Sequence, residues 1–115
     1  MYKLLFGLLV LSSSIFGNEA TIQAVKVGKQ NGLYTFSVRI LHKDSGWEHY
    51  VNRYEVLDQK GEILATRTLW HPHEHEQPFT RSLSGVDVKN NTTVYIRAND
   101  SMDGYSQKFK VSLKK

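Results

Sequence analysis

LYTFSVRIL, residues 33–41, alternates apolar and polar side chains with a period of two. Because successive side chains of a β-strand point to opposite faces, this pattern predicts a half-buried strand. The core face of that strand would carry Tyr34, Phe36, Val38 and Ile40, and the opposite face Thr35, Ser37 and Arg39.

Shorter runs of the same kind follow along the chain, and turn residues separate them. RYEVL, TVYIRA and KFKVSL alternate in the same way, and no helical stripe of useful length appears. We predict seven strands, at about residues 20–28, 33–41, 50–57, 62–69, 79–84, 92–98 and 106–113. Seven short strands in roughly a hundred residues predict an all-β fold, an immunoglobulin-like antiparallel β-sandwich, with a small closed barrel as the alternative.

The N-terminal stretch MYKLLFGLLVLSSSIFGNEA has the layout of a secretory signal peptide. Lys3 precedes an apolar run that is too short to span a bilayer, and small residues follow the run. We predict a signal peptide over residues 1–17, cleaved after Gly17 or alternatively at Ala20, and a single domain over residues 18–115. The alternative is a buried N-terminal strand or helix. No Cys follows the apolar run, so we expect a periplasmic or secreted protein without a stable membrane anchor after signal cleavage.

The composition limits both the partners and the chemistry. The chain has 15 Lys and Arg against 11 Asp and Glu, and removal of Lys3 leaves 14 against 11, a net charge of +3. This surplus is spread out, whereas nucleic-acid binding usually shows a concentrated basic stripe, so no nucleic acid is expected as a partner. Cys is absent, which excludes thiolate chemistry and zinc sites built on Cys. The patterns of nucleophilic enzymes and of phosphate loops are missing, so enzymatic activity is not favoured.

The loops between the predicted strands differ between the two ends of the sandwich. If the strands cross and return, one end collects KQNG, DQKG and GVDVKNN, which are plain turns. The other end collects HKDSGWEHY, WHPHEHEQP and NDSMDGYS, with all five His, both Trp and six acidic residues. Because binding residues usually gather on loops that a rigid scaffold positions, any activity is predicted at this second end.

The sequence His71-Pro72-His73 is the clearest candidate for metal binding. In an extended segment these two imidazoles point to the same side, about 6.5–7 Å apart, and Pro72 favours that extended geometry. Two further imidazoles can come from the neighbouring loop. We therefore predict a metal site with four ligands, His42, His49, His71 and His73.

Other loop residues have secondary roles in this hypothesis. Glu76 and Asp100 are candidates for an oxygen ligand or for an acceptor that orients an imidazole. Trp47 and Trp70 would form a lip around the site or, alternatively, cap the end of the core. His75 is predicted to be exposed. A set of nitrogen and oxygen ligands suits Cu(II) or Zn(II), and Ni(II) to a lesser degree, and disfavours Ca(II) and Mg(II).

Two classes of function compete for these loops. The first is an exported protein that uses its His cluster to bind a divalent transition metal, for metal binding, delivery or sensing. The alternative is a metal-free periplasmic interaction or ligand-binding module, in which the same loops contact a periplasmic protein partner or a small ligand. A metalloenzyme is a third hypothesis, although no second catalytic group supports it.

The run HKDSGWEHYVNRYEVLDQKGEILATRTLWHPHEHEQPFTRSLSGV, followed by IRANDSMDGY, resembles an uncharacterised family of small exported bacterial β-sandwich proteins. The shared pattern is GW-x-H-Y, then HPH-x-x-EQPFTRS, then RA-x-DS and GY, and it covers most of the mature chain. The matching positions are His42, Gly46, Trp47, His49, Tyr50, His71, His73, Glu76, Gln77, Pro78, Phe79, Thr80, Arg81, Asp100 and Gly104. The resemblance implies a β-sandwich fold and no particular activity.

WEHYVNRYEV is also similar to the EHYIxWIE stretch of superoxide reductases. Those proteins are immunoglobulin-like and bind iron through four His and one Cys. Because this chain has no Cys, the resemblance does not imply that reductase activity. It implies only that a site made of His is compatible with a scaffold of this kind.

Overall fold

A computed structural model describes residues 20–113 as an all-β fold. The predicted signal peptide, residues 1–17, lies outside this range. The strands are β1 (Thr21–Gln30), β2 (Leu33–Leu41), β3 (Val51–Leu57), β4 (Ile63–Thr68), β5 (Phe79–Val86), β6 (Thr93–Asp100), β7 (Gly104–Tyr105) and β8 (Phe109–Ser112). Residues 20–113 contain no helix that is long and apolar enough to cross a membrane.

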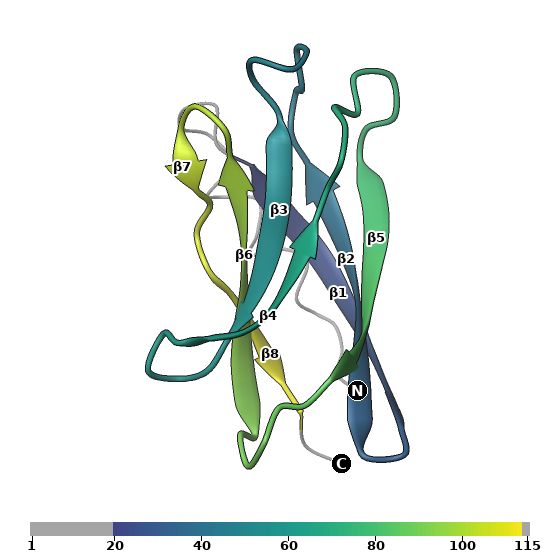
Figure 1. The fold of residues 1–115 in the computed structure, drawn as a ribbon, viewed down its shortest axis with the longest axis vertical. Helices are drawn as coiled ribbons and strands as arrows, with labels where there is room; N and C mark the ends of the chain where they lie inside the picture. The colour runs from purple at the N-terminus through teal and green to yellow at the C-terminus, as the bar shows by residue number, and fades with distance from the viewer. Residues whose placement is uncertain (1–19, 114–115) are drawn as a thin grey trace.

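The strands form two antiparallel sheets, which confirms the predicted β-sandwich (Figure 1). One sheet has the order β1-β2-β5, and the other has the order β4-β3-β6-β7, with β8 also paired to β6. The predicted last strand, 106–113, is shorter in the structure, where β8 begins only at Phe109 and the two-residue β7 ends before Ser106. The reason lies at Ser106, whose hydroxyl accepts the N–H of Ala98 at 3.0 Å. This side chain replaces a backbone carbonyl as the acceptor and so interrupts the ladder.

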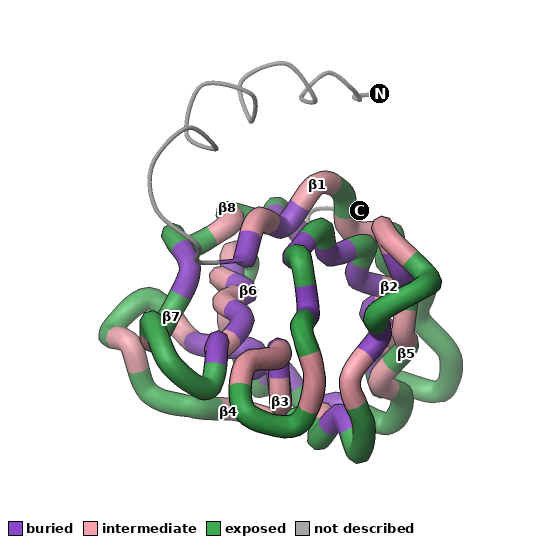
Figure 2. The backbone as a smooth tube through the Cα atoms, turned by 90° about the horizontal axis from the view of Figure 1, so that it is seen from above, coloured by how far each residue is buried: buried purple, intermediate pink, exposed green. Residues whose placement is uncertain are grey.

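The core fills the space between the two sheets, as the buried stretches in Figure 2 show. The alternation of β2 places Phe36, Val38 and Ile40 there, with no exposed surface. From the opposite sheet, the fully buried Tyr54 donates its hydroxyl hydrogen to the carbonyl oxygen of Arg81 at 2.9 Å. Because a buried hydroxyl must find an acceptor, this bond fixes the distance between the sheets as well as filling the core.

A buried carboxylate lies on the outer face of the second sheet. Glu55 accepts hydrogen bonds from Nε of Arg53 at 2.9 Å, Nε of Arg97 at 2.8 Å and the hydroxyl of Tyr105 at 3.2 Å. The Arg97 guanidinium also covers the Tyr105 ring, 3.6 Å from its centroid. Burial alone would raise the pKa of Glu55, but the bonds from the two guanidinium groups outweigh it and lower this pKa below its ordinary 4.5.

Glu55→Gln is expected to lower the free energy of unfolding by about 2 kcal/mol at pH 7, because an amide replaces an acceptor of charged hydrogen bonds. The lowered pKa stabilises the folded state above about pH 4.5, and this contribution is lost as the pH falls through the folded-state value. Urea unfolding at pH 7 and pH 3 should therefore show a difference between variant and wild type that shrinks on acidification. Glu62→Gln, at an exposed position, is the matched control. A pH-independent difference would contradict this account of the cluster.

The predicted separation of loops between the two ends is also confirmed (Figure 1). The β2–β3 loop (42–50), the β4–β5 loop (69–78) and the β6–β7 turn (101–103) lie at one end. The short turns 31–32, 58–62 and 87–92 lie at the other. Both long loops cross from one sheet to the other, so their residues lie over the open end of the core.

Candidate metal centre

Two polar side chains extend the inward faces of their strands beyond the hydrophobic core. His42 follows β2 and keeps the inward direction of Ile40. Asp100 is the last residue of β6 and keeps the inward direction of Ala98. Both side chains are buried, and Nε2 of His42 lies 2.8 Å from Oδ2 of Asp100. The period of two that builds the core thus also brings an imidazole and a carboxylate together at its end.

A second carboxylate holds the other side of the His42 ring. Nδ1 of His42 donates to Oδ1 of Asp44 at 2.6 Å. Since ionised carboxylates only accept hydrogen bonds, both ring nitrogens carry a hydrogen in this arrangement. Burial alone would lower the pKa of His42, but the hydrogen bonds to Asp44 and Asp100 outweigh it and raise this pKa. Burial would raise the pKa of each Asp, yet their hydrogen bonds lower both values.

His49 completes a compact group from the same end of the sandwich. Its Nε2 lies 3.0 Å from the same Oδ2 of Asp100 and 3.3 Å from Oδ2 of Asp103. The rings of His42 and His49 meet edge to face, with centroids 5.0 Å apart. One ligand atom from each of His42, His49 and Asp100 lies within 4.8 Å of the other two.

The chemistry of this group fits a metal ion. Asp44 holds Nδ1 of His42 and so leaves Nε2 as the atom that faces Asp100, the arrangement in which a carboxylate orients a metal-binding imidazole. His49 and Asp103 lie on the solvent side of the group, with 20% of the His49 side chain and 40% of the Asp103 side chain exposed. Two imidazole nitrogens and one or two carboxylate oxygens would surround the ion, with access from solvent.

The two histidines of the His-Pro-His sequence lie close together but apart from this group. Their ring centroids are 4.8 Å apart, and His71 is exposed whereas His73 is buried. The ring of His73 stacks on Phe79, with centroids 4.0 Å apart and planes 9° from parallel. The four predicted ligands therefore do not meet at one point, because the packing of His73 on Phe79 keeps its ring away from Asp100. The four histidines thus form two sets: His42 and His49 lie with Asp100, and His71 and His73 form a separate pair.

Two residues outside the predicted set connect the loops. Asp44 accepts the backbone N–H of His73 through Oδ2 at 2.6 Å. Gln77 accepts the N–H of His42 at 2.9 Å and donates to the carbonyl oxygen of His73 at 2.8 Å. The spacing His42-x-Asp44 could have indicated the first contact, since residues two apart in extended chain share a side. No local signal points to Gln77, which acts across 35 residues.

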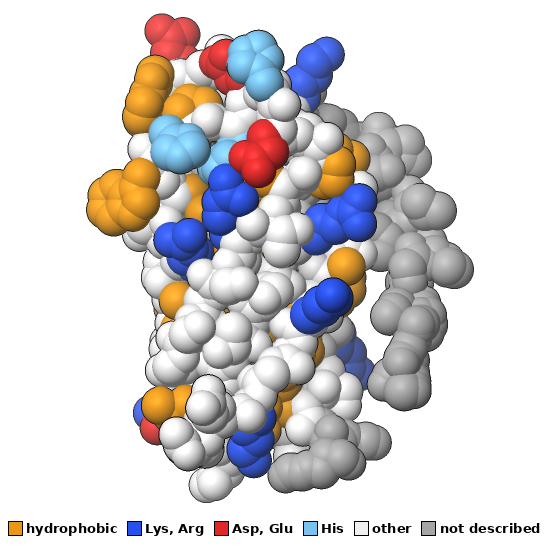
Figure 3. Space-filling view, turned by 90° about the vertical axis from the view of Figure 1, so that its right-hand side faces the viewer, with side chains coloured by type: hydrophobic (Ala, Val, Ile, Leu, Met, Phe, Trp, Pro, Cys, Tyr) orange, Lys and Arg blue, Asp and Glu red, His pale blue; other side chains and the backbone are white. Residues whose placement is uncertain are grey.

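The remaining predicted residues lie around the group. Glu76 pairs with Arg81 at 3.1 Å, so its carboxylate is engaged outside the group of His42, His49 and Asp100. Trp47 and Trp70 are 67% and 74% exposed, so neither side chain caps the core, and a lip around the site stays a prediction. His75 is exposed, as predicted. Figure 3 shows His, acidic and large hydrophobic side chains gathered at this upper end of the molecule.

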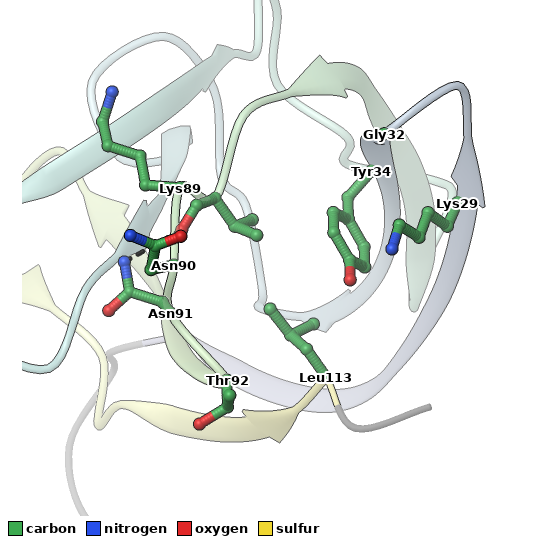
Figure 4. A pocket seen from close by; sticks show the side chains of 9 residues that line it. Lys29, Gly32, Tyr34, Lys89, Asn90, Asn91, Thr92 and Leu113 are labelled. Atoms are coloured by element: carbon green, nitrogen blue, oxygen red, sulfur yellow. Dashed lines mark hydrogen bonds between the residues drawn. The ribbon is translucent and has the colours of Figure 1, made fainter.

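A pocket of about 440 Å³ lies at the opposite end of the sandwich (Figure 4). Its lining consists of Lys29, Gly32, Tyr34, Val88, Lys89, Asn90, Asn91, Thr92 and Leu113. The Lys29 ammonium lies 5.4 Å from the centroid of the Tyr34 ring, and the Asn91 amide donates to the carbonyl oxygen of Val88. This lining has no His or carboxylate, so it does not offer the ligands that a transition metal prefers.

Comparison with known proteins gives one relative. A "Putative lipoprotein" of Halomicrobium mukohataei is 38% identical over 89 residues, which are 76% of this chain and 43% of that protein. The chain thus spans less than half the length of the curated relative that it matches. No family model matches the chain, and no solved structure matches it either. The two resemblances drawn from its motifs remain predictions.

Proposed function

We propose that this protein is exported and binds a divalent transition-metal ion through His42, His49 and Asp100. The observation that carries the proposal is the placement of two imidazole Nε2 atoms at 2.8 and 3.0 Å from one carboxylate oxygen. Asp44 orients the first of these imidazoles from behind. The N-terminal sequence and the name of the relative, a "Putative lipoprotein", both support export.

The charges around the site also favour a cation. Three carboxylates, from Asp44, Asp100 and Asp103, contact two imidazoles. A divalent ion would replace the ring hydrogens that now face Asp100, so its binding would release protons. The mixed nitrogen and oxygen ligands suit Cu(II) or Zn(II) better than Ca(II), which takes six to eight oxygen ligands. Access from solvent suits metal binding, delivery or sensing, in which the ion must exchange.

Titration with Zn(II) tests the proposal. We expect one ion to bind at the His42–His49–Asp100 centre with a Kd below about 1 µM, with release of protons into a weak buffer. At a free concentration of about a hundred times Kd, binding should add about 2.7 kcal/mol to the free energy of unfolding. Ca(II) is the control and should leave the melting temperature unchanged. A Kd above about 100 µM for Zn(II) and Cu(II) alike would overturn the proposal.

A metal-free interaction module is the second candidate function, and the exposed hydrophobic side chains favour it. Trp47, Trp70 and Met102 are each at least 66% exposed, and all three are on or beside the loops of this end. Exposed Trp and Met are typical of surfaces that bind protein partners, here a periplasmic one. In that case, chelators and metal ions should leave both the stability and the Trp fluorescence of the protein unchanged.

A further inference from the structure

A second pocket lies beside the metal centre, between the β2–β3 and β4–β5 loops. Its volume is about 430 Å³. Its lining consists of Trp47, His71, Pro72, His73, Glu74, His75 and Glu76. Asp44 separates this pocket from the metal centre, because its carboxylate holds His42 on one side and the backbone of His73 on the other.

The pocket contains a polar side chain whose hydrogen-bonding capacity is unused. The side chain of His73 is 2% exposed, and neither ring nitrogen has a hydrogen-bond partner among residues 20–113. Its Nδ1 is 3.8 Å from Oδ2 of Asp44, too long for a hydrogen bond. A buried polar group without a partner costs about 1–3 kcal/mol, so a ligand that engages this ring would relieve a cost already present in the fold.

His73 is available as a nitrogen ligand, because neither of its ring nitrogens has a hydrogen-bond partner among residues 20–113. A neutral imidazole has a free lone pair on one nitrogen, and this lone pair binds a metal ion. The ring of His71 lies beside it, with centroids 4.8 Å apart and planes tilted by 39°. As His71 is exposed, its side chain can change rotamer and give an ion access to His73.

The pocket also has a carboxylate that is not committed to an arginine. Glu76 is paired with Arg81 at 3.1 Å. Among residues 20–113, the exposed ring of His75 is the basic side chain that Glu74 meets, at 4.0 Å, and 43% of the Glu74 side chain is exposed. Oε2 of Glu74 lies beside Gly46, 3.3 Å from the place that a Cβ at Gly46 would take. The carboxylate is therefore beside the β2–β3 loop, which contributes Trp47 to the same pocket.

We propose that this pocket binds a second divalent transition-metal ion, with His71, His73 and the Glu74 carboxylate as its ligands. Two imidazoles and one carboxylate form the same class of ligand set as the first centre, and they suit Cu(II) or Zn(II). The second site shares no ligand with the first, so either can be occupied alone.

The number of bound ions tests this proposal. We expect equilibrium dialysis of the whole protein against Zn(II), followed by elemental analysis, to give two ions per chain. His71→Ala and, separately, Glu74→Gln should weaken the second ion at least about tenfold and leave the first unchanged. Both positions are exposed, so neither change should disturb folding. His75→Ala, an exposed histidine of the same loop, is the matched control and should retain both ions.

The His49→Ala variant separates this proposal from the proposed function. Loss of one ion in His49→Ala and of the other in His71→Ala supports both. A single ion that only His71→Ala removes supports the second site and overturns the first. A single ion that only His49→Ala removes overturns the second site alone, as do two ions that His71→Ala and Glu74→Gln leave unchanged. Absence of bound Zn(II) overturns both proposals.

Discussion

Asp100→Asn is expected to weaken Zn(II) binding at the His42–His49–Asp100 centre by about a hundredfold while the fold is retained. Structural zinc sites bind with about 10–16 kcal/mol over four ligands, so the loss of one charged ligand costs about 3 kcal/mol. Asp100 is the position of largest effect, because one of its oxygens lies within 3.0 Å of both imidazole Nε2 atoms.

The amide preserves the contacts that the fold needs. Oδ1 of Asp100 accepts the N–H of Met102 at 2.9 Å, and an asparagine oxygen can do the same. The amide NH2 group would then face His42 and His49, and each ring can accept one of its hydrogens once its Nε2 carries no hydrogen. Competition titration with a zinc chelator measures the change. Asp87→Asn is the control, because Asp87 accepts a backbone N–H at the opposite end. An affinity within about threefold of wild type would contradict the role given to Asp100.

The strands could be predicted from the sequence because their signal is local. In LYTFSVRIL the alternation alone places Phe36 and Val38 in the core, and both are fully buried. The late start of the last strand, at Phe109 and not at residue 106, could not be predicted. It depends on the hydroxyl of Ser106 replacing a backbone acceptor for Ala98, a contact that strand propensity does not register.

The candidate site was predictable in its place and only partly in its members. The order of strands and loops placed every histidine at one end, as the structure does. The meeting of His42 with Asp100 follows from the inward faces of two strands 58 residues apart. The spacing of His71 and His73 indicated that the two rings lie close together, and their centroids are 4.8 Å apart. It could not indicate that Phe79 packs against His73, since that contact depends on how the loop folds over the core.

Asp44→Asn is expected to weaken metal binding at the same centre by about ten- to a hundredfold, because Asp44 sets the tautomer of His42. Oδ1 accepts Nδ1–H of His42 and Oδ2 accepts the N–H of His73, both at 2.6 Å. An amide has only one oxygen, so it can satisfy only one of these two donors. The outcome for the metal centre depends on which donor loses its acceptor.

If the amide oxygen keeps the N–H of His73, its NH2 group faces Nδ1 of His42. That nitrogen must then accept, so it loses its hydrogen and the one ring hydrogen that remains is on Nε2. Nε2 then donates to Asp100, and this hydrogen cannot move to Nδ1 to free Nε2 for a metal ion. If the oxygen keeps His42, two donors meet at His73, and the buried N–H there loses its acceptor at a cost of about 1–3 kcal/mol. In either case the ion binds a form of the protein that the variant disfavours, so its affinity falls.

Nitrogen-15 chemical shifts of the His42 ring distinguish the two tautomers in the metal-free variant. Asp58→Asn, which replaces another acceptor of backbone N–H groups, is the matched control. Equal Zn(II) affinities in the two variants would contradict the role given to Asp44.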